Sequence, residues 1–235
     1  MKLVLFSNLT EEEKTDAVER LIAQSTPNQD YFFMIFLSIM TAVFGILLNS
    51  ITVLIGSMLI APLLSPILSL SLGIIISDGN LINRSFVTII KSMAIGVGSA
   101  AIASLVFRGM SIPSDLLVST EPSLLYVGVA IIAGFAAAFA LVKPKLNEML
   151  PGVAISVALI PPIALMGIGI SEWSWSMITG GFVVFLVNAI GIIFAGMVTF
   201  SLMNFYTKKR VAKEAVKVED KKLEIEKELA ETEEE

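Results

Sequence analysis

Six stretches of this chain are apolar for about 20 residues each, and this pattern restricts the fold more than any other feature of the sequence. A helix needs about 20 mainly apolar residues to cross the roughly 30 Å hydrocarbon layer of a membrane. Apolar residues make up 55% of the chain and charged residues only 16%, which is outside the range of ordinary soluble domains. The sequence therefore predicts an all-α, polytopic membrane protein with spans at 31–48, 51–77, 85–107, 123–142, 150–170 and 175–203.

The second and fifth apolar stretches carry glycine and proline and resemble each other. With a shift of 96 residues, the coinciding pairs are Gly56 and Gly152, Leu63 and Leu159, Pro66 and Pro162, and Gly73 and Gly169. Proline inside a helix removes a backbone donor and clashes with the preceding turn, so we expect both of these helices to be interrupted. The coinciding glycines and prolines favour a duplicated unit, although apolar helices also resemble each other by composition alone.

The positive side chains predict the orientation, because lysine and arginine near membrane spans gather on the cytoplasmic side. If six spans follow a cytoplasmic N-terminus, Arg108 lies outside, and the inner side receives Lys14, Arg20, Arg84, Lys91, Lys143, Lys145 and residues 208–210. We therefore expect a multi-pass protein of the cell membrane with both termini in the cytoplasm. Three spans in each copy would make the repeat inverted. The alternative is four or five spans, with the glycine- and proline-containing stretches re-entrant.

The same pattern divides the chain into five parts. They are a cytoplasmic amphipathic segment (1–30), a first membrane repeat (31–107), an extracytoplasmic loop (108–122), a second membrane repeat (123–203) and a charged cytoplasmic helix (204–235).

The sequence predicts a helix in each of the two flanking segments. Thr10 and Glu13 have the spacing of a capping box, which predicts a helix that begins there and ends near Pro27. Its apolar face would consist of Ala17, Val18, Leu21 and Ile22. The last segment repeats an apolar residue every seven positions, at Val211, Val218 and Ile225. This spacing fits a solvated helix or a short oligomerising coiled coil.

The interrupted helices supply the candidate binding site. A broken helix leaves backbone N–H and C=O groups without partners in a medium that cannot solvate them, and such groups bind ions or polar solutes in transporters. Asn188 is the most central polar residue of the sixth span. The candidate ion- or substrate-binding residues are Gly56, Ser57, Pro62, Ser65, Pro66, Gly152, Ser156, Pro161, Pro162 and Asn188. The alternative is structural: serine hydroxyls satisfy the freed carbonyls, glycine allows close packing, and Asn188 bridges two helices.

Several kinds of chemistry are excluded by composition. The chain contains no cysteine and no histidine, and no carboxylate lies in the middle of a predicted span. We therefore expect no catalytic residues, no metal site and no cofactor, and we do not expect an enzyme. The net charge of −5 comes largely from the two ends and does not indicate binding to nucleic acid.

The chain also resembles a known family. The stretches at 48–66 and 143–162, followed by Phe185–Gly191, are similar to the uncharacterised hydrophobic-domain family of prokaryotes, domain of unknown function 389. The resemblance covers about residues 31 to 203. It implies a polytopic membrane protein of bacteria or archaea and adds no substrate.

Two functions fit these observations. The first is a small transporter or channel for a small polar or ionic solute, with its site at the midplane between the interrupted helices 2 and 5, assembled as a homo-oligomer in the lipid bilayer. The second is a non-transporting scaffold or sensor whose terminal helices recruit a cytoplasmic partner. Flux through liposomes separates the two.

Overall fold

The computed structural model describes residues 9–107, 124–143, 146 and 158–233, and within these residues all regular structure is helical. The predicted all-α class is therefore confirmed, while the predicted loop at 108–122 lies outside the described residues. The helices are α2 (Glu11–Gln24), α3 (Gln29–Leu47), α4 (Ile51–Ile60), α5 (Leu64–Ile75), α6 (Gly79–Val106), α8 (Leu124–Val142), α10 (Ile160–Ser171), α11 (Trp175–Leu202), the 3-10 turn η3 (Phe205–Lys208) and α12 (Lys209–Glu233).

Three helices, α3, α6 and α11, are each long and apolar enough to cross a membrane. The pair α4 and α5 would make a fourth span, but the two helices meet at an angle of 50°. α10 and the Val127–Val142 part of α8 are apolar but shorter. The six predicted stretches thus correspond to three long helices, one bent pair and two shorter helices.

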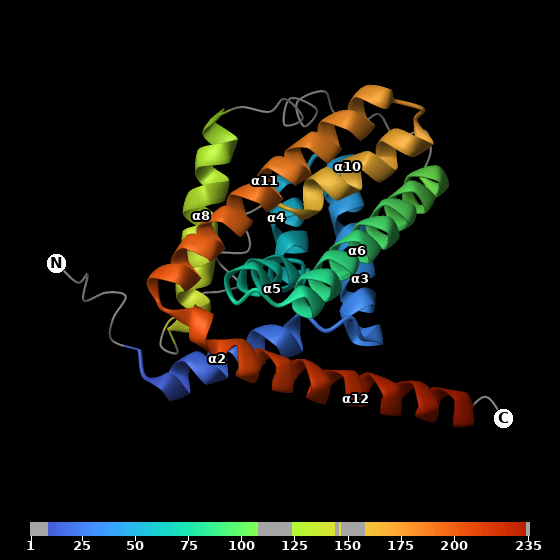
Figure 1. Cartoon of the computed structure of the whole chain (residues 1–235). Coiled ribbons are helices and arrows are strands. Elements are labelled where there is room, and N and C mark those ends of the chain that lie inside the picture. Colours follow the sequence, from blue (N-terminus) through green and yellow to red (C-terminus); the bar gives the residue numbers. More distant parts are fainter. Residues whose placement is uncertain (1–8, 108–123, 144–145, 147–157, 234–235) are drawn as a thin grey trace.

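α5 and α10 are the central helices of the bundle. Eight of the twelve residues of α5 and ten of the twelve residues of α10 are buried, and a helix that is apolar on all sides belongs in an interior. α5 packs against α6 and α11, and α10 packs against α3, α6 and α11. In Figure 1 the long helices α6 and α11 slant across the bundle with α10 between them.

Glycine allows these central helices to approach their neighbours closely. A Cβ at Gly167 of α10 would lie 2.4 Å from the Cβ of Ala100 in α6, and one at Gly196 of α11 would lie 2.8 Å from Ser71 Oγ in α5. Neither distance leaves room for a side chain. The glycines therefore set the two crossings at the centre of the fold.

The turns after α5 and α10 have the same local structure. Ser77 and Trp173 each adopt a left-handed conformation, with φ of 53° and 54°, which closes a helix and reverses the chain. Gly73 and Gly169 lie one turn before them, where a Cβ would contact the backbone N of Ile82 and Ile178, respectively, at 3.1 Å. Both glycines allow the following helix to return close to the preceding one.

These two turns lie at opposite ends of α6. Lys209 Nζ donates to the Ser77 carbonyl at 2.6 Å, so the α5–α6 turn lies beside the start of α12. Ser171 Oγ donates to Ser104 Oγ at 2.7 Å, so the α10–α11 turn lies beside the last turn of α6.

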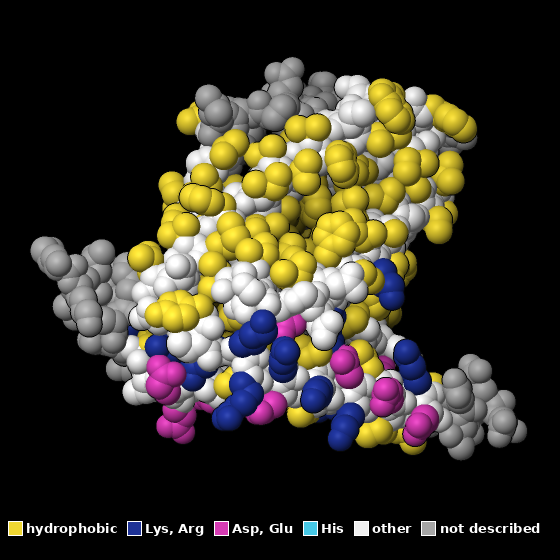
Figure 2. All heavy atoms as spheres, in the orientation of Figure 1, with side chains coloured by type: hydrophobic (Ala, Val, Ile, Leu, Met, Phe, Trp, Pro, Cys, Tyr) yellow, Lys and Arg dark blue, Asp and Glu magenta, His cyan; other side chains and the backbone are white. Residues whose placement is uncertain are grey.

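α2 and α12 form a polar base under one end of the bundle (Figure 1). The predicted capping box is confirmed, because Glu13 N–H donates to Thr10 Oγ1 at 3.1 Å and Thr10 N–H donates to Glu13 Oε2 at 2.8 Å. The predicted apolar face of α2 is buried against the bundle. Figure 2 shows charged side chains gathered on this base, below a body covered with hydrophobic side chains.

Candidate functional site

The first candidate site is the break between α4 and α5. α4 ends at Ile60, Ala61 has an extended conformation with ψ of 126°, and α5 begins at Leu64. Pro62 lies in the break, where it has no N–H to continue the α4 ladder. The predicted interruption of the second span is therefore present, and it turns the chain by 50°.

The break borders an open groove of about 480 Å³. Most of its polar side chains come from the end of α2, the α2–α3 connection and the start of α3, with Ser65 from α5, and its apolar wall comes from α3, α4 and α5. Because the start of α3 and the end of α2 contribute to it, the groove opens on the side of the polar base. Its polar lining residues are Gln24, Thr26, Asn28, Asp30, Tyr31 and Ser65.

The polar candidates near this break already have partners. Ser57 is fully buried, and its hydroxyl donates to the Leu54 carbonyl at 2.6 Å. The Ser57 carbonyl in turn accepts from Ser38 Oγ of α3 at 2.7 Å. Ser65 is half-buried and donates to Gln24 Oε1 at 3.4 Å. Gly56 is different, because a Cβ there would meet no other atom within 4 Å.

The prolines at the starts of α5 and α10 initiate these helices. Pro66 lies in the first turn of α5, and Pro161 and Pro162 lie in the first turn of α10. The first four N–H groups of a helix have no intrahelical acceptor, so proline fits there without loss of a hydrogen bond. The same prolines remove donors that a bound anion would use, which makes the start of α10 poorer in N–H groups than an ordinary helix end.

Asn188 of α11 lies at the second candidate site. It is 4% exposed, and its Nδ2 donates to the carbonyl of Ala158 at 3.2 Å. Ala158 has a left-handed φ of 42° directly before α10 begins. The amide of Asn188 thus bridges α11 to the backbone carbonyl of Ala158, two residues before α10 begins. Bridging two helices is one of the two roles expected for it.

The candidate residues therefore form two groups rather than a single cluster. Ser57, Pro62, Ser65 and Pro66 surround the α4–α5 break, while Pro161, Pro162 and Asn188 surround the start of α10. Among the residues that the structure describes, no hydrogen bond joins the two groups. Gly152 and Ser156 lie outside the described residues, as does the rest of the predicted interruption in the fifth span.

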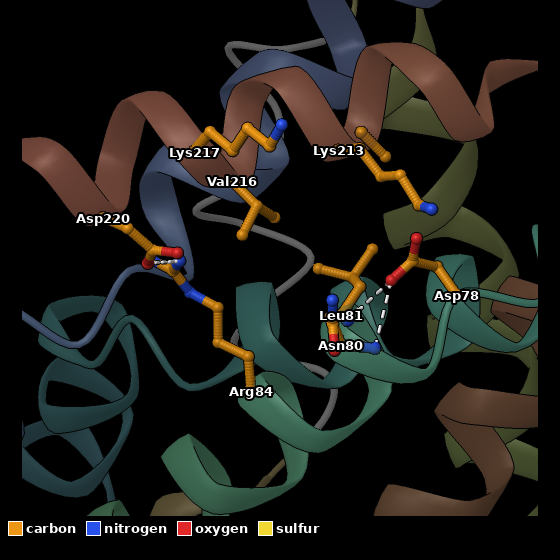
Figure 3. A pocket seen from close by; sticks show the side chains of 9 residues that line it. Asp78, Asn80, Leu81, Arg84, Lys213, Val216, Lys217 and Asp220 are labelled. Atoms are coloured by element: carbon orange, nitrogen blue, oxygen red, sulfur yellow. Dashed lines mark hydrogen bonds and ion pairs between the residues drawn. The ribbon is translucent and has the colours of Figure 1, made fainter.

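A third polar site, which the sequence pattern did not single out, lies between α6 and α12. Arg84 of α6 pairs with Asp220 of α12, and its NH2 donates to Thr26 Oγ1 at 3.0 Å. A pocket of about 410 Å³ lies beside this pair and is also lined by Asp78, the N-cap of α6 (Figure 3). The sequence signal is the Asp-Gly-Asn run at 78–80, which lies between the predicted spans 51–77 and 85–107.

Two buried lysines tie the base together at Glu11. Lys208 Nζ contacts the Glu11 carboxylate at 2.9 Å and donates to the Glu11 carbonyl at 2.8 Å, and Lys14 Nζ contacts the same carboxylate at 2.8 Å. The hydrogen bonds from Lys14 and then from Lys208 lower the pKa of Glu11 from 4.5 to about 2. The start of α12 is thereby held on the first turn of α2.

Comparison with known proteins agrees with the resemblance found in the sequence. The profile of the family described as "Domain of unknown function (DUF389)" matches residues 58–194, which is more than half of the chain. The uncharacterized protein MJ0678 of Methanocaldococcus jannaschii is 31% identical over 211 residues, covering 82% of this chain and 63% of its own length. The chain thus spans less than two thirds of that relative. No solved structure matches the chain.

Proposed function

We propose that this chain, which belongs to the DUF389 family, is a small membrane transporter or channel for a small polar or ionic solute. The family description assigns no activity, so the proposal is built on the geometry. The observation that carries it is the α4–α5 break, where a bend of 50° within an apolar bundle meets an open groove with one polar and one apolar wall. Backbone that is interrupted at membrane depth is tolerated where it is buried in protein or lines a water-filled cavity.

The proposal includes an inverted repeat of three spans. A shift of 96 residues carries the bounds of α5 onto those of α10 and the bounds of α6 onto those of α11. The same shift carries the left-handed Ser77 onto Trp173. Because the α5–α6 and α10–α11 turns lie at opposite ends of α6, the two related hairpins point in opposite directions. This is the arrangement expected of inverted repeats.

The packing between the two copies supports the same symmetry. Ser71 of α5 contacts Gly196 of α11, and Gly167 of α10 contacts Ala100 of α6. The shift of 96 residues takes Ser71 to Gly167 and Gly196 to Ala100, so it converts the first contact into the second. Such reciprocal contacts are the signature of a two-fold axis. A two-fold axis between inverted halves gives one fold two related openings, which is how alternating access works in many carriers.

In this proposal the groove at the α4–α5 break is the cytoplasmic entrance. The positive residues of the base, including Arg84 and Lys209, would then lie on the cytoplasmic side together with both termini. By the same symmetry the start of α10 would face the other side, with the Asn188 amide and the Ala158 carbonyl beside it. A solute would pass between the two groups of candidate residues as one or the other group is exposed.

The test is flux in liposomes that contain the purified protein, with Na⁺, K⁺, chloride and phosphate as the first solutes. Replacing Pro62 by Ala supplies an N–H that can extend the α4 ladder across the break. We expect Pro62→Ala to change the flux of the transported ion by about tenfold or more while the protein still folds. Gly98→Ala is the control, because a methyl group there meets open space.

The absence of flux for every solute, or equal flux in Pro62→Ala and the unaltered protein, would contradict the proposal. One observation favours the alternative of a scaffold that recruits a partner or a second copy: Val218, Ile225 and Leu229 of α12 are all more than half exposed. If serine at these three positions abolishes co-purification of a partner while no flux is found, the scaffold function replaces transport.

A further inference from the structure

The pocket between α6 and α12 has two buried polar atoms without partners. Asp78 is 4% exposed, and its Oδ1 accepts from the N–H groups of Asn80 and Leu81, both at 3.1 Å. Its second oxygen, Oδ2, is buried and has no hydrogen-bond partner, and neither has Nε of Arg84. Asp78, which has an unpaired acceptor, and Arg84, which has an unpaired donor, therefore both line the same pocket of about 410 Å³.

The charges around the pocket suit a ligand with both a cationic and an anionic group. Its lining includes three cationic side chains, Arg84, Lys213 and Lys217, and two carboxylates, Asp78 and Asp220. Asp220 already pairs with Arg84. In Figure 3 the free oxygen of Asp78 points toward the side of the pocket where Lys213 lies. A free carboxylate oxygen accepts a hydrogen bond from an N–H or O–H donor, while the lysines bind a phosphate or another anion.

Farther along α6 the exposed face is apolar. It carries Phe86, Val87 and Ile90, which are 54%, 39% and 46% exposed. Val87 lies one turn from Arg84 on the same side of the helix, and Phe86 and Ile90 lie farther round it. Figure 2 shows the hydrophobic surface of the body directly above the band of charged side chains. A ligand with a zwitterionic head and apolar tails would therefore place its head in the pocket and its tails along α6.

We propose that this pocket binds the headgroup of phosphatidylethanolamine from the cytoplasmic leaflet. The phosphate faces Lys213 and Lys217, and the primary amine donates to Asp78 Oδ2. Basic pockets at the cytoplasmic ends of membrane helices bind lipid headgroups in this manner. The carboxylate adds selectivity, because the quaternary ammonium of phosphatidylcholine has no N–H to donate. The site rests on the membrane placement proposed above, and lipid binding is measured without any flux.

The experiment is native mass spectrometry of the purified chain in detergent, titrated with phosphatidylethanolamine or phosphatidylcholine of identical acyl chains. We expect the unaltered protein to prefer phosphatidylethanolamine by about tenfold, the effect of one charge-assisted hydrogen bond. Asp78→Asn should lose this preference while α6 stays capped, since asparagine is as good an N-cap as aspartate. Lys213→Gln with Lys217→Gln should weaken binding of both lipids, and Lys227→Gln, an exposed position outside the pocket, should change nothing.

Equal binding of the two lipids by the unaltered protein, or an unchanged preference in Asp78→Asn, would overturn the assignment. Soluble glycerophosphoethanolamine carries the same head without tails. If it displaces the lipid at equal concentration, the pocket belongs to a soluble ligand and the lipid assignment is wrong. Should Asp78→Asn fail to fold, the double lysine variant on the surface of α12 still decides whether the pocket is the site.

Discussion

At the scale of single residues, small side chains decide how closely the central helices approach. Gly167 and Ala100 meet at the α6–α10 crossing, and Gly196 and Ser71 meet at the α5–α11 crossing. Lipid tails are as apolar as leucine, so burial alone does not hold helices together inside a membrane, and close van der Waals packing replaces it. Polar residues add a second layer of contacts, as when Ser38 donates to the freed carbonyl of Ser57.

Gly167→Ala should therefore destabilise the protein. The added methyl would lie 2.4 Å from Ala100 Cβ and 2.5 Å from the Val97 carbonyl oxygen, and backbone cannot move away as a flexible side chain can. We expect a loss of about 1–3 kcal/mol, typical of overpacking, measured as a lower midpoint of thermal unfolding in detergent. Gly98→Ala, with no atom within 4 Å of the new Cβ, is the matched control. Equal midpoints for the two variants would mean that the crossing is looser than described.

At the scale of elements, α12 is held on the body over its first half by apolar packing and by a few polar contacts. Ala212 is buried, and Val211, Ala215 and Val216 pack against the core. Val218, Ile225 and Leu229 farther along are exposed. The apolar residues at sevenfold spacing in this helix therefore lie on two surfaces. Val211 packs against the bundle, and Val218 and Ile225 are exposed.

The pair formed by Arg84 and Asp220 should be a main anchor of α12. Arg84 is 13% exposed at its side chain and also bonds Thr26, so removing it detaches α12 from both α6 and the α2–α3 connection. Arg84→Gln should weaken the docking of α12 by about 1 kcal/mol. This loss is smaller than for a fully buried ion pair, because Asp220 is half exposed. Hydrogen exchange of the α12 amides measures this, and Lys222→Gln, which removes a pair within α12, is the control. Unchanged exchange in Arg84→Gln would show that apolar packing alone holds the helix.

The contact between α2 and α12 should depend on pH through Glu11. The folded protein lowers the pKa of this carboxyl from 4.5 to about 2, so the charged form is favoured in the folded state. Its contribution is fully present above pH 4.5 and is lost as the pH falls toward 2. We expect exchange at the start of α12 to be constant from pH 7 to 5, after correction for intrinsic rates, and to increase below that. Glu11→Gln should remove this dependence, whereas an unchanged profile in that variant would assign it to another group.

At the scale of the whole molecule, the inverted repeat proposed above would have unequal ends. The bounds of α5 and α6 and the two central crossings repeat at 96 residues, while α2 and α12 lie together under one end of the bundle. Inverted repeats place equivalent positions on opposite sides of a membrane. The polar base would then cover only one of the two openings.

Single cysteines test this arrangement directly, because the chain contains no cysteine of its own. Asn80 and Ser176 are both exposed and are 96 residues apart, at the starts of α6 and α11. In intact cells a membrane-impermeant thiol reagent should label Ser176→Cys and leave Asn80→Cys unlabelled until the membrane is opened. Labelling of both positions from the same side would contradict the inverted repeat.

Much of the fold was predictable from the sequence because its determinants are local. The capping box at Thr10 and Glu13, the apolar stretches and the break around Pro62 depend on residues within one or two helical turns, and the structure has each of them. The roles of the prolines were less predictable. Pro66, Pro161 and Pro162 were expected to break helices, and they lie where helices begin, because the same missing N–H is harmless in a first turn.

Only the tertiary structure decided which polar groups meet. Arg84 and Asp220 are separated by 136 residues, and Lys208 and Glu11 by 197. Each of these charges alone looks like an ordinary solvated side chain near a helix end, so no local pattern marks it. Folding brings α12 under α2 and α6, buries the Asp78 carboxylate and gives the groove at Pro62 its polar wall. Hydropathy and chain breaks are properties of short segments, whereas a site is a property of segments brought together, and that is why the sequence alone determined the helices and left the sites open.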